Sequence, residues 1–171
     1  MGKPLKRHPA FVPVSRDHHF GLLLVWKIRQ GREKGIAPDR LFNYVKYFYS
    51  NHIAPHFSLE ESVIFSYMAK NDLLRKEVES QHQDIRKAYK ELGGFQKDEL
   101  LNKLDEFCQK IEAHIRFEER KLFQYMQVEL LKKELEEMEE KVAAIHKPVT
   151  EDWEDKFWRS EEHTSELQSP S

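Results

Sequence analysis

The sequence predicts an all-α protein: an up-down-up-down four-helix bundle with an additional C-terminal helix. Apolar residues recur at three-to-four spacing along most of the 171 residues, and no alternating strand pattern competes with that periodicity. Only six residues are Gly, and charged residues make up 34% of the chain against 39% hydrophobic residues. This length suits one domain with a single core, in which long helices joined by short connections pack as a bundle.

The first two helices have recognisable ends. Ser15 or Asp17 can cap a first helix, because a short polar side chain accepts a hydrogen bond from a free N–H of the first turn. Pro38 or Asp39 begins a second helix. Pro55 interrupts this helix, and a proline at that position removes one backbone hydrogen bond and usually kinks the chain.

Three further helices follow. The third carries an apolar stripe from Leu74 to Leu92 and ends at Gly93-Gly94, and the fourth begins at Asp98. The sequence VELLKKELEEMEEKVAAIHK, residues 128–147, predicts a fifth helix that is highly charged on one side and stops at Pro148. Beyond it lie three aromatic residues that we expect to pack back onto the bundle, namely Trp153, Phe157 and Trp158.

The last residues of the chain have a different character. RSEEHTSELQS, residues 159–169, resembles the in-frame translation of a common sequencing-library adapter, so we expect residues 159–171 to be non-native. The predicted organisation is an N-terminal extension at 1–14, the bundle at 15–127, the C-terminal helix and tail at 128–158, and the non-native segment at 159–171.

Charge and composition exclude several classes of protein. The formal net charge of -2 gives no general attraction to nucleic acid or to an acidic membrane surface. The single Cys108 excludes an internal disulfide framework. No stretch is apolar enough to span a bilayer, and the N-terminus lacks the apolar core of a signal peptide, so we expect a cytoplasmic location.

Imidazoles and carboxylates interrupt the apolar stripes of the four bundle helices. His56 and Glu60 are one turn apart and leave the same helix face, and His114 and Glu118 repeat that spacing. The third stripe contains His82, and the first helix begins with His18 and His19, either of which can turn inward.

These polar residues predict a metal site. A single core histidine is more often hydrogen-bonded to a neighbour than bound to a metal ion. Burying two carboxylates and several imidazoles without strong partners, however, would cost several kcal/mol per charge. A shared cation removes that cost, and two bridging carboxylates with a shell of His nitrogens suit two iron ions with an open position for a small ligand.

The order of these residues resembles a known family. A first-helix His, a His-x-x-x-Glu, a single His and a second His-x-x-x-Glu are similar to the hemerythrin-like superfamily, the His-His-Glu cation-binding domains, over about 16–123. The fifth helix is similar to that of the iron-sensing domain of an animal F-box protein. The resemblance implies a non-haem di-iron centre whose ligands are His19, His56, Glu60, His82, His114 and Glu118, with the two carboxylates bridging the irons.

The first-helix ligand is chosen by the family pattern. Members usually place an apolar residue three positions after this ligand, which favours His19, followed by Leu22, while His18 remains the alternative.

The sequence departs from the oxygen carriers of the family. Arg86 stands where those proteins have a second His one turn after the third-helix ligand, and Glu118 lies four residues after the last His, where they use an Asp at five. The iron-sensing relative has a Glu directly after the second-helix His, where this chain has Phe57. One side-chain ligand is therefore unaccounted for. His52, one turn before His56, or a water molecule would fill that position. Because the Pro55 kink separates His52 from His56, a role for His52 beside the ligands or on the helix surface is favoured.

The function predicted is binding or sensing of dioxygen or iron at the di-iron site, with dioxygen or a related small oxidant as ligand and no catalytic residue assigned. A protein partner would contact the C-terminal helix, and neither nucleic acid nor membrane is expected. The first alternative is a di-iron oxidoreductase acting on peroxide or nitric oxide, and the second is a metal-free helical bundle. Ferritin-like proteins need two Glu-x-x-His motifs, and only Glu79 to His82 fits.

Overall fold

The computed structural model describes residues 6–160, in which all regular secondary structure is helical. The predicted non-native segment lies, from residue 161 on, outside the described residues. The first two helical stretches are α1 (Val12–Glu33) and a continuous run of α2 (Pro38–Phe48), η1 (Tyr49–Ile53), α3 (Ala54–Leu59), η2 (Glu60–Ile64) and η3 (Phe65–Tyr67). The remaining stretches are α4 (Leu73–Glu91) with η4 (Leu92–Gly94), the run of α5 (Lys97–Phe117), η5 (Glu118–Leu122) and α6 (Phe123–Glu129), and finally α7 (Lys132–Ile145).

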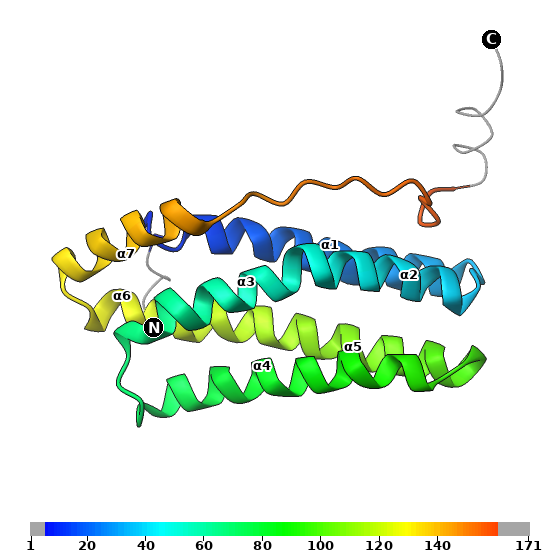
Figure 1. Cartoon of the computed structure of the whole chain (residues 1–171), viewed down its shortest axis with the longest axis horizontal. Helices are drawn as coiled ribbons and strands as arrows, with labels where there is room; N and C mark the ends of the chain where they lie inside the picture. The colour runs from blue at the N-terminus through cyan, green and yellow to red at the C-terminus, as the bar shows by residue number, and fades with distance from the viewer. Residues whose placement is uncertain (1–5, 161–171) are drawn as a thin grey trace, which may run out of the picture.

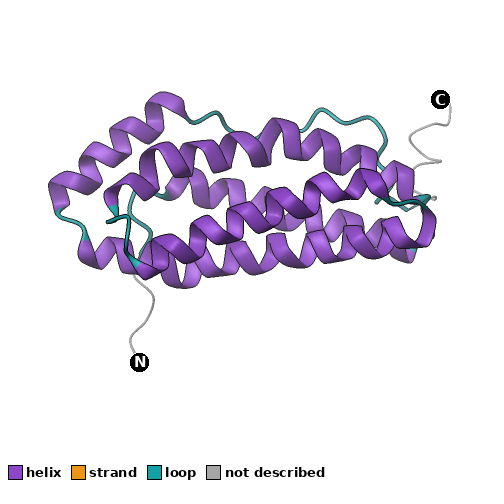
Figure 2. Ribbon diagram, turned by 60° about the horizontal axis from the view of Figure 1, so that its bottom comes forward, coloured by secondary structure: helices purple, strands orange, loops and turns teal. Residues whose placement is uncertain are grey.

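These stretches form a helical bundle. The long helices run side by side along the long axis of the molecule, and α7 lies at one end, inclined to that axis (Figures 1 and 2). Helix α5 packs against both α1 and α4, so it occupies a central place in the bundle. No helix within residues 6–160 combines the length and the apolar character that crossing a membrane requires.

Helix α1 begins earlier than the sequence indicated. It starts at Val12 with Pro13 in its first turn, where a missing backbone N–H costs nothing. The prediction that Ser15 or Asp17 caps the helix is therefore wrong. The Ser15 hydroxyl instead donates a hydrogen bond to Glu119, 2.8 Å away, and the Asp17 carboxylate accepts one from His56.

The Pro55 interruption is accommodated by a wider helical turn. The preceding turn, η1, is a π-helix, and the Ala54 N–H donates to the Tyr49 carbonyl five residues back. Pro55 then falls in the first turn of α3, where it needs no N–H. The helix thus continues past the proline toward His56.

The fifth predicted helix is divided in two. Residues 128 and 129 complete α6, Leu130 and Leu131 are extended, and α7 begins at Lys132. The Glu134 carboxylate accepts a hydrogen bond from the Leu131 N–H and fixes this start. A straight continuation would carry the apolar face of α7 past the end of the bundle, whereas the turn buries Leu135, Met138 and Val142.

Two apolar clusters fill the bundle, one toward each end, and the polar core residues lie between them. The cluster nearer the α1–α2 connection includes Leu24, Ile85 and Ile111, and the other includes Val14 and Leu122. Along each long helix the buried imidazoles and carboxylates fall between members of the two clusters. The packing of both ends therefore holds a polar layer in the middle.

The C-terminal tail packs onto the bundle, as the sequence predicted. Phe157 is 4% exposed and belongs to the first cluster, against which Trp153 and Trp158 also pack. Phe157 fits beside Gly31 of α1, where an added Cβ would approach its ring to 2.9 Å.

Candidate metal centre

Four imidazoles and two carboxylates meet in the polar layer. His18, His56, Glu60 and Glu118 form one group, and Glu60, His82, His114 and Glu118 form a second, so both carboxylates are shared. The ligand atoms of each group lie within 4.8 Å of one another. Every one of these residues is buried, and Glu60, His82 and Glu118 have no exposed surface.

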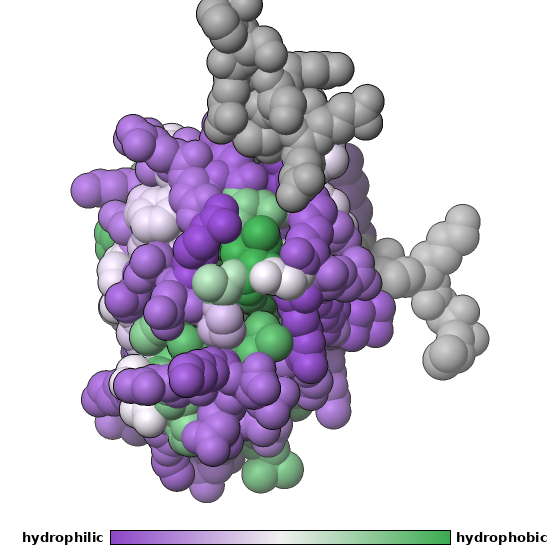
Figure 3. All heavy atoms as spheres, turned by 90° about the vertical axis from the view of Figure 1, so that its right-hand side faces the viewer, coloured by the Kyte–Doolittle hydropathy of each residue, from purple (hydrophilic) through white to green (hydrophobic). Residues whose placement is uncertain are grey.

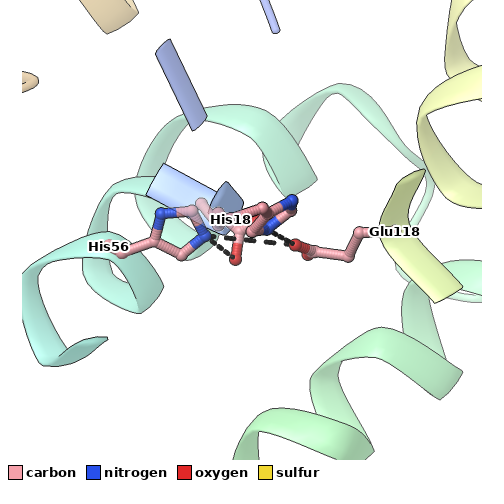
Figure 4. Close-up of side chains that lie close together, drawn as sticks. His18, His56 and Glu118 are labelled. Atoms are coloured by element: carbon pink, nitrogen blue, oxygen red, sulfur yellow. Dashed lines mark ion pairs between the residues drawn. The ribbon is translucent and has the colours of Figure 1, made fainter. Parts of the chain in front are cut away.

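The first group joins α1, α3 and the α5–η5 junction. In Figure 4, His18 and His56 both face Glu118. The His18 Nε2 atom lies 2.8 Å from Glu118 Oε1, and His56 Nε2 lies 3.2 Å from Glu60 Oε1 and 4.0 Å from Glu118 Oε1. All three contacts use the Nε2 atom of the ring.

The second group repeats this arrangement on α4 and α5. His82 Nε2 lies 3.1 Å from Glu60 Oε1, and His114 Nε2 lies 3.5 Å from Glu118 Oε1. Two ligands that each stand about 2.1 Å from one ion are about 3.0–3.4 Å apart in octahedral or tetrahedral geometry. Most of the nitrogen–oxygen separations in the two groups are therefore close to those of atoms that share a cation.

The outer nitrogen of each ring has its own acceptor. Each Nδ1–H donates to an oxygen at 2.6–2.9 Å, in the pairs His18 with Glu119, His56 with Asp17, His82 with Glu61, and His114 with Gln81. A carboxylate can only accept, so Nδ1 carries a proton, and in the neutral ring the Nε2 lone pair faces the carboxylates. Metal-binding histidines are oriented in this way.

These outer acceptors were missed in the sequence, although a signal for two of them is present. The sequence His-x-x-x-Glu-Glu occurs at 56–61 and again at 114–119. In each copy the first Glu points inward, and the second reaches an imidazole of another helix, Glu61 to His82 and Glu119 to His18. The other two acceptors, Asp17 and Gln81, directly precede His18 and His82, so the centre has an approximate internal two-fold symmetry.

Both shared carboxylates begin a π-helical turn. The turn η2 starts at Glu60 and η5 starts at Glu118. The Phe65 N–H donates to the Glu60 carbonyl, and the Phe123 N–H donates to the Glu118 carbonyl, each across five residues. One π turn accommodates an extra residue in the helix, so neighbouring Glu side chains can serve different partners. Single π turns of this kind are frequent at functional sites.

Protons balance the negative charge of the centre when no cation does. Burial alone would lower the pKa of His18, but the adjacent carboxylates of Glu118 and Glu119 raise it to about 9. Burial likewise opposes protonation of His82, and its bonds to Glu60 and Glu61 raise its pKa to about 9. Imidazoles this basic indicate an excess of carboxylate charge that a cation would also balance.

Burial and neighbouring charges also shift the pKa values of Glu60 and His114. Burial would raise the pKa of Glu60, but the charge of His56 and hydrogen bonds from its neighbours hold it well below the usual range. Burial and repulsion from the surrounding imidazoles lower the pKa of His114 to about 3, although Glu118 opposes this. His114 is therefore neutral and carries a free lone pair, as a metal ligand must.

Several buried atoms that face inward have no hydrogen-bond partner. They are the Nε2 atoms of His18, His56 and His114, the Oε2 atom of Glu60 and both carboxylate oxygens of Glu118. Buried polar atoms are rarely left in this state, because each costs roughly 1–3 kcal/mol. A donor set of imidazole nitrogens and carboxylate oxygens suits a transition-metal ion of intermediate hardness, so the residues present fit such an ion.

A small cavity adjoins the first group. It has a volume of about 30 Å³ and lies beside the rings of His18, His56 and His114. Its other walls are mostly apolar and include Phe48, Ile53, Phe57, Ile111 and Ile115. This space is sufficient for one or two water-sized molecules, and its walls offer few polar partners for them.

Two of the residues predicted for the site lie outside it. His19 is exposed on α1, and the neighbouring His18 is the residue that turns inward, because successive helical residues point about 100° apart. The choice of His19 is thus replaced by the alternative, His18. His52 lines the cavity, but its Nε2–H donates to the Thr150 carbonyl at 3.1 Å, which directs that nitrogen away from the carboxylates.

Comparison with known proteins adds no relative. No family model, curated protein or solved structure matches this chain. The candidate site therefore rests on the geometry of this chain alone: two buried groups of His and Glu that could hold metal and that share both carboxylates.

Proposed function

We propose that this protein is hemerythrin-like: an up-down-up-down four-helix bundle, extended by a C-terminal helix, that holds two iron ions and binds or senses dioxygen. The sharing of Glu60 and Glu118 by two groups of ligands is the observation that carries this proposal. A carboxylate with two oxygens can bridge two cations, and each cation would then also have two imidazoles.

Iron fits the donor set better than a structural zinc ion. Structural zinc is satisfied by four ligands in a closed tetrahedron, whereas imidazole–carboxylate sites with open positions are typical of non-haem ferrous iron. Ferrous iron, when bound, would supply the electrons that dioxygen chemistry requires. The residues of the chain would supply the lone pairs, through Nε2 atoms that their Nδ1 partners hold in place.

The cavity favours a small neutral ligand over peroxide. Cleavage of a peroxide O–O bond needs a proton donor close to the leaving oxygen. The walls beside His18 and His56 are formed by Phe57, Ile111 and Ile115, and the nearby His52 already donates its Nε2–H to Thr150. This lining offers few hydrogen bonds to water and has room for a diatomic molecule, so binding or sensing is the preferred function.

The cytoplasmic location and a partner that contacts α7 stay predictions. Helix α7 and the residues before it carry exposed apolar side chains, of which Leu131 is 61% and Ile145 54% exposed.

The decisive experiment is to measure iron per chain after anaerobic purification, with optical spectra before and after exposure to air. We expect about two irons and a new near-ultraviolet band on oxidation. The Asp98→Ala variant is the control, because it changes an acidic residue in the first turn of α5, far from the site in sequence. It should contain as much iron as the wild-type protein. A wild-type chain that neither contains iron nor takes it up on reconstitution would contradict the proposal.

A further inference from the structure

The segment after α7 runs back along the bundle as a strap, which we define as residues His146–Trp158. It forms no helix, and in Figure 1 it passes from α7 along α1 toward the far end of the molecule. That end is largely hydrophilic, with a hydrophobic strip near its centre (Figure 3). Since the strap has no internal ladder of hydrogen bonds, its position depends on its contacts with the bundle.

The strap supplies the partner of a buried lysine. Lys27 of α1 is 4% exposed, and its ammonium group donates to the Tyr44 hydroxyl at 3.2 Å and to the Glu151 carboxylate. The Tyr44 hydroxyl donates to the same carboxylate. The Trp158 ring also covers the Lys27 ammonium, with 4.1 Å from Nζ to the ring centre. Undocking the strap would separate the Lys27 ammonium group from its carboxylate and from the Trp158 ring, so the docked position is a specific one.

Three further contacts hold the same part of the strap. Asp155 forms a two-pronged ion pair with Arg40, with N–O distances of 2.7 and 2.9 Å. The Trp153 ring stacks on Tyr47, with ring centres 4.9 Å apart, and Phe157 fills the space beside Gly31. These contacts lie on α1 and α2 and involve none of the metal-centre residues.

The other part of the strap reaches the metal centre. The His146 Nε2–H donates to both oxygens of Asp17, at 2.9 and 3.0 Å, and Asp17 also accepts the Nδ1–H of His56 at 2.9 Å. Val149 lines the cavity, and Thr150 accepts the hydrogen bond from His52. The strap thus forms one wall of the cavity and bonds to the residue that orients a candidate ligand.

Within residues 6–160, the hydrogen bonds from His146 to Asp17 have no counterpart at Gln81, the equivalent residue in the other half of the centre. Asp17 and Gln81 occupy equivalent positions, each before an inward His and each accepting from the His of one His-x-x-x-Glu-Glu copy. Gln81 offers its single carbonyl oxygen to His114. Asp17 has two oxygens and a charge, and it uses both oxygens to bind His146 as well.

We propose that Asp17 is a positioning residue that couples metal on His56 to docking of the strap, and that the docked strap limits access to the cavity. This inference rests on the proposed function, because it requires a metal ion at the centre. A groove of about 630 Å³ is lined by Asp17, His52 and His56, by Ile145 at the end of α7, and by the strap from His146 to Thr150. It leads to the same residues, so the docked strap would control access along it.

The coupling has a direct physical cause. A metal ion on Nε2 fixes the tautomer and the orientation of the His56 ring, so Nδ1–H points at Asp17 and holds its carboxylate toward His146. By thermodynamic reciprocity, if metal favours the docked strap by some factor, the docked strap raises metal affinity by the same factor. The strap would then report on the metal centre.

Two tryptophans on the strap make the coupling measurable. In a Trp26→Phe background the remaining tryptophans are Trp153 and Trp158, and acrylamide quenching of their fluorescence measures how often the strap is released. We expect anaerobic loading with Mn²⁺, a substitute for ferrous iron, to lower the acrylamide quenching constant at least twofold relative to the metal-free protein. Metal analysis of the same samples establishes loading.

Asp17→Gln should remove that metal-dependent difference, because the substituted residue keeps an acceptor for His56 but loses the charge that holds His146. Gln81→Ala is the matched control, since it removes the equivalent acceptor without touching the strap, and it should keep the difference. The variants are compared at full loading, verified by metal analysis. An Asp17→Gln protein with the wild-type difference would overturn the proposed role of Asp17.

Access is tested separately by the rate at which a chelator removes Mn²⁺. Glu151→Ala combined with Phe157→Ala should accelerate removal about tenfold, whereas Glu154→Ala, an exposed change on the same strap, should leave it unchanged. Metal binding with equal removal rates and equal quenching in all variants would overturn this inference alone. A protein that binds no metal would overturn the proposed function as well.

Discussion

Glu60 and Glu118 are fully buried at the meeting point of four helices, where a carboxylate loses its hydration. An isolated carboxylate in that environment would be strongly destabilising. In the metal-free protein the imidazoles offset this cost by binding protons, and in the metal-bound protein the cations would do so. The amount of iron bound per chain can therefore distinguish a ligand shared by both groups from a ligand that belongs to one group.

Removing a shared ligand and removing a terminal ligand should have different results. Glu118 belongs to both groups, so Glu118→Ala should reduce bound iron from about two per chain to nearly none. His82 belongs to one group, and His82→Ala should leave about one. Iron analysis on anaerobically reconstituted protein checks this, with circular dichroism to confirm folding. Wild-type iron content in Glu118→Ala would exclude the site.

The metal-free protein should lose stability as the pH rises. The pKa of His18 and that of His82 are raised from 6.5 to about 9 in the folded state, so folding takes up protons. Their stabilising contribution is fully present below pH 6.5 and is lost as the pH rises through 9, by an amount on the order of a few kcal/mol. Urea denaturation from pH 6.5 to 9 measures it.

The metal-loaded protein is the control for that titration. Metal binding requires neutral imidazoles, so the loaded protein should not lose stability over the same pH range. A metal-free protein whose stability was constant or increasing between pH 6.5 and 9 would contradict the assigned protonation of His18 and His82.

At the scale of elements, the ends and irregular turns of the helices position the centre. The π turns at Glu60 and Glu118 let consecutive Glu residues face different partners, and the π turn before Pro55 carries the helix on to His56. Helix α4, which presents His82, depends on a conventional cap. Asp72 accepts hydrogen bonds from the N–H groups of Leu74 and Arg75, at 2.8 and 3.4 Å.

Removing this cap should destabilise the whole bundle without changing the ligands. The second oxygen of Asp72 also accepts the Tyr125 hydroxyl at 2.7 Å, which links α4 to α6. Asp72→Ala should lower the free energy of unfolding by about 1–2 kcal/mol. Tyr125→Phe removes only the link between the helices and should cost less. Urea denaturation of the metal-free proteins decides, and an Asp72→Ala protein as stable as wild type would contradict the capping role.

At the scale of the whole molecule, metal binding would be coupled to folding. The ligands come from α1, α3 with η2, α4, and α5 with η5, and they meet only when all four long helical stretches are packed. A ligand set assembled from the entire bundle does not exist in the unfolded chain. A bound metal ion would therefore stabilise the native state by mass action.

Chelation should accordingly lower the melting temperature. At free metal concentrations about 100 times the dissociation constant, one site contributes about 2.7 kcal/mol, and removing the metal should lower Tm by several degrees for a chain of this size. Differential scanning calorimetry with and without chelator measures the change. The melting temperature of Glu118→Ala should hardly change with chelator. A wild-type melting temperature that chelator leaves unchanged would indicate that the His and Glu cluster binds no metal.

The tail and the break before α7 show where sequence patterns reach their limit. The residues from 128 to 147 have continuous helical character, and nothing local in them indicates a turn at Leu130 and Leu131. That turn is made because it buries Met138 and Val142 against the apolar cluster at that end of the bundle. Periodicity identifies an apolar face but not the surface that covers it.

The sequence by itself determined the all-helical class, most helix positions and the inward placement of His56, Glu60, His82, His114 and Glu118. Helical periodicity and the His-x-x-x-Glu spacing are local properties, because residues four apart share a helix face wherever the helix packs. The polar residues were noticeable because they interrupt apolar stripes.

The tertiary structure decided which first-helix histidine faces inward and which residues orient the ligands. His18 shares its face with Val14, Gly21 and Val25, all buried, whereas Leu22, whose apolar side chain favoured His19, is 40% exposed. The acceptors Asp17, Glu61, Gln81 and Glu119 bond to imidazoles on other helices, 21 to 101 residues away. The rotation of α1 and these pairings depend on how the helices pack against one another, which no local pattern encodes.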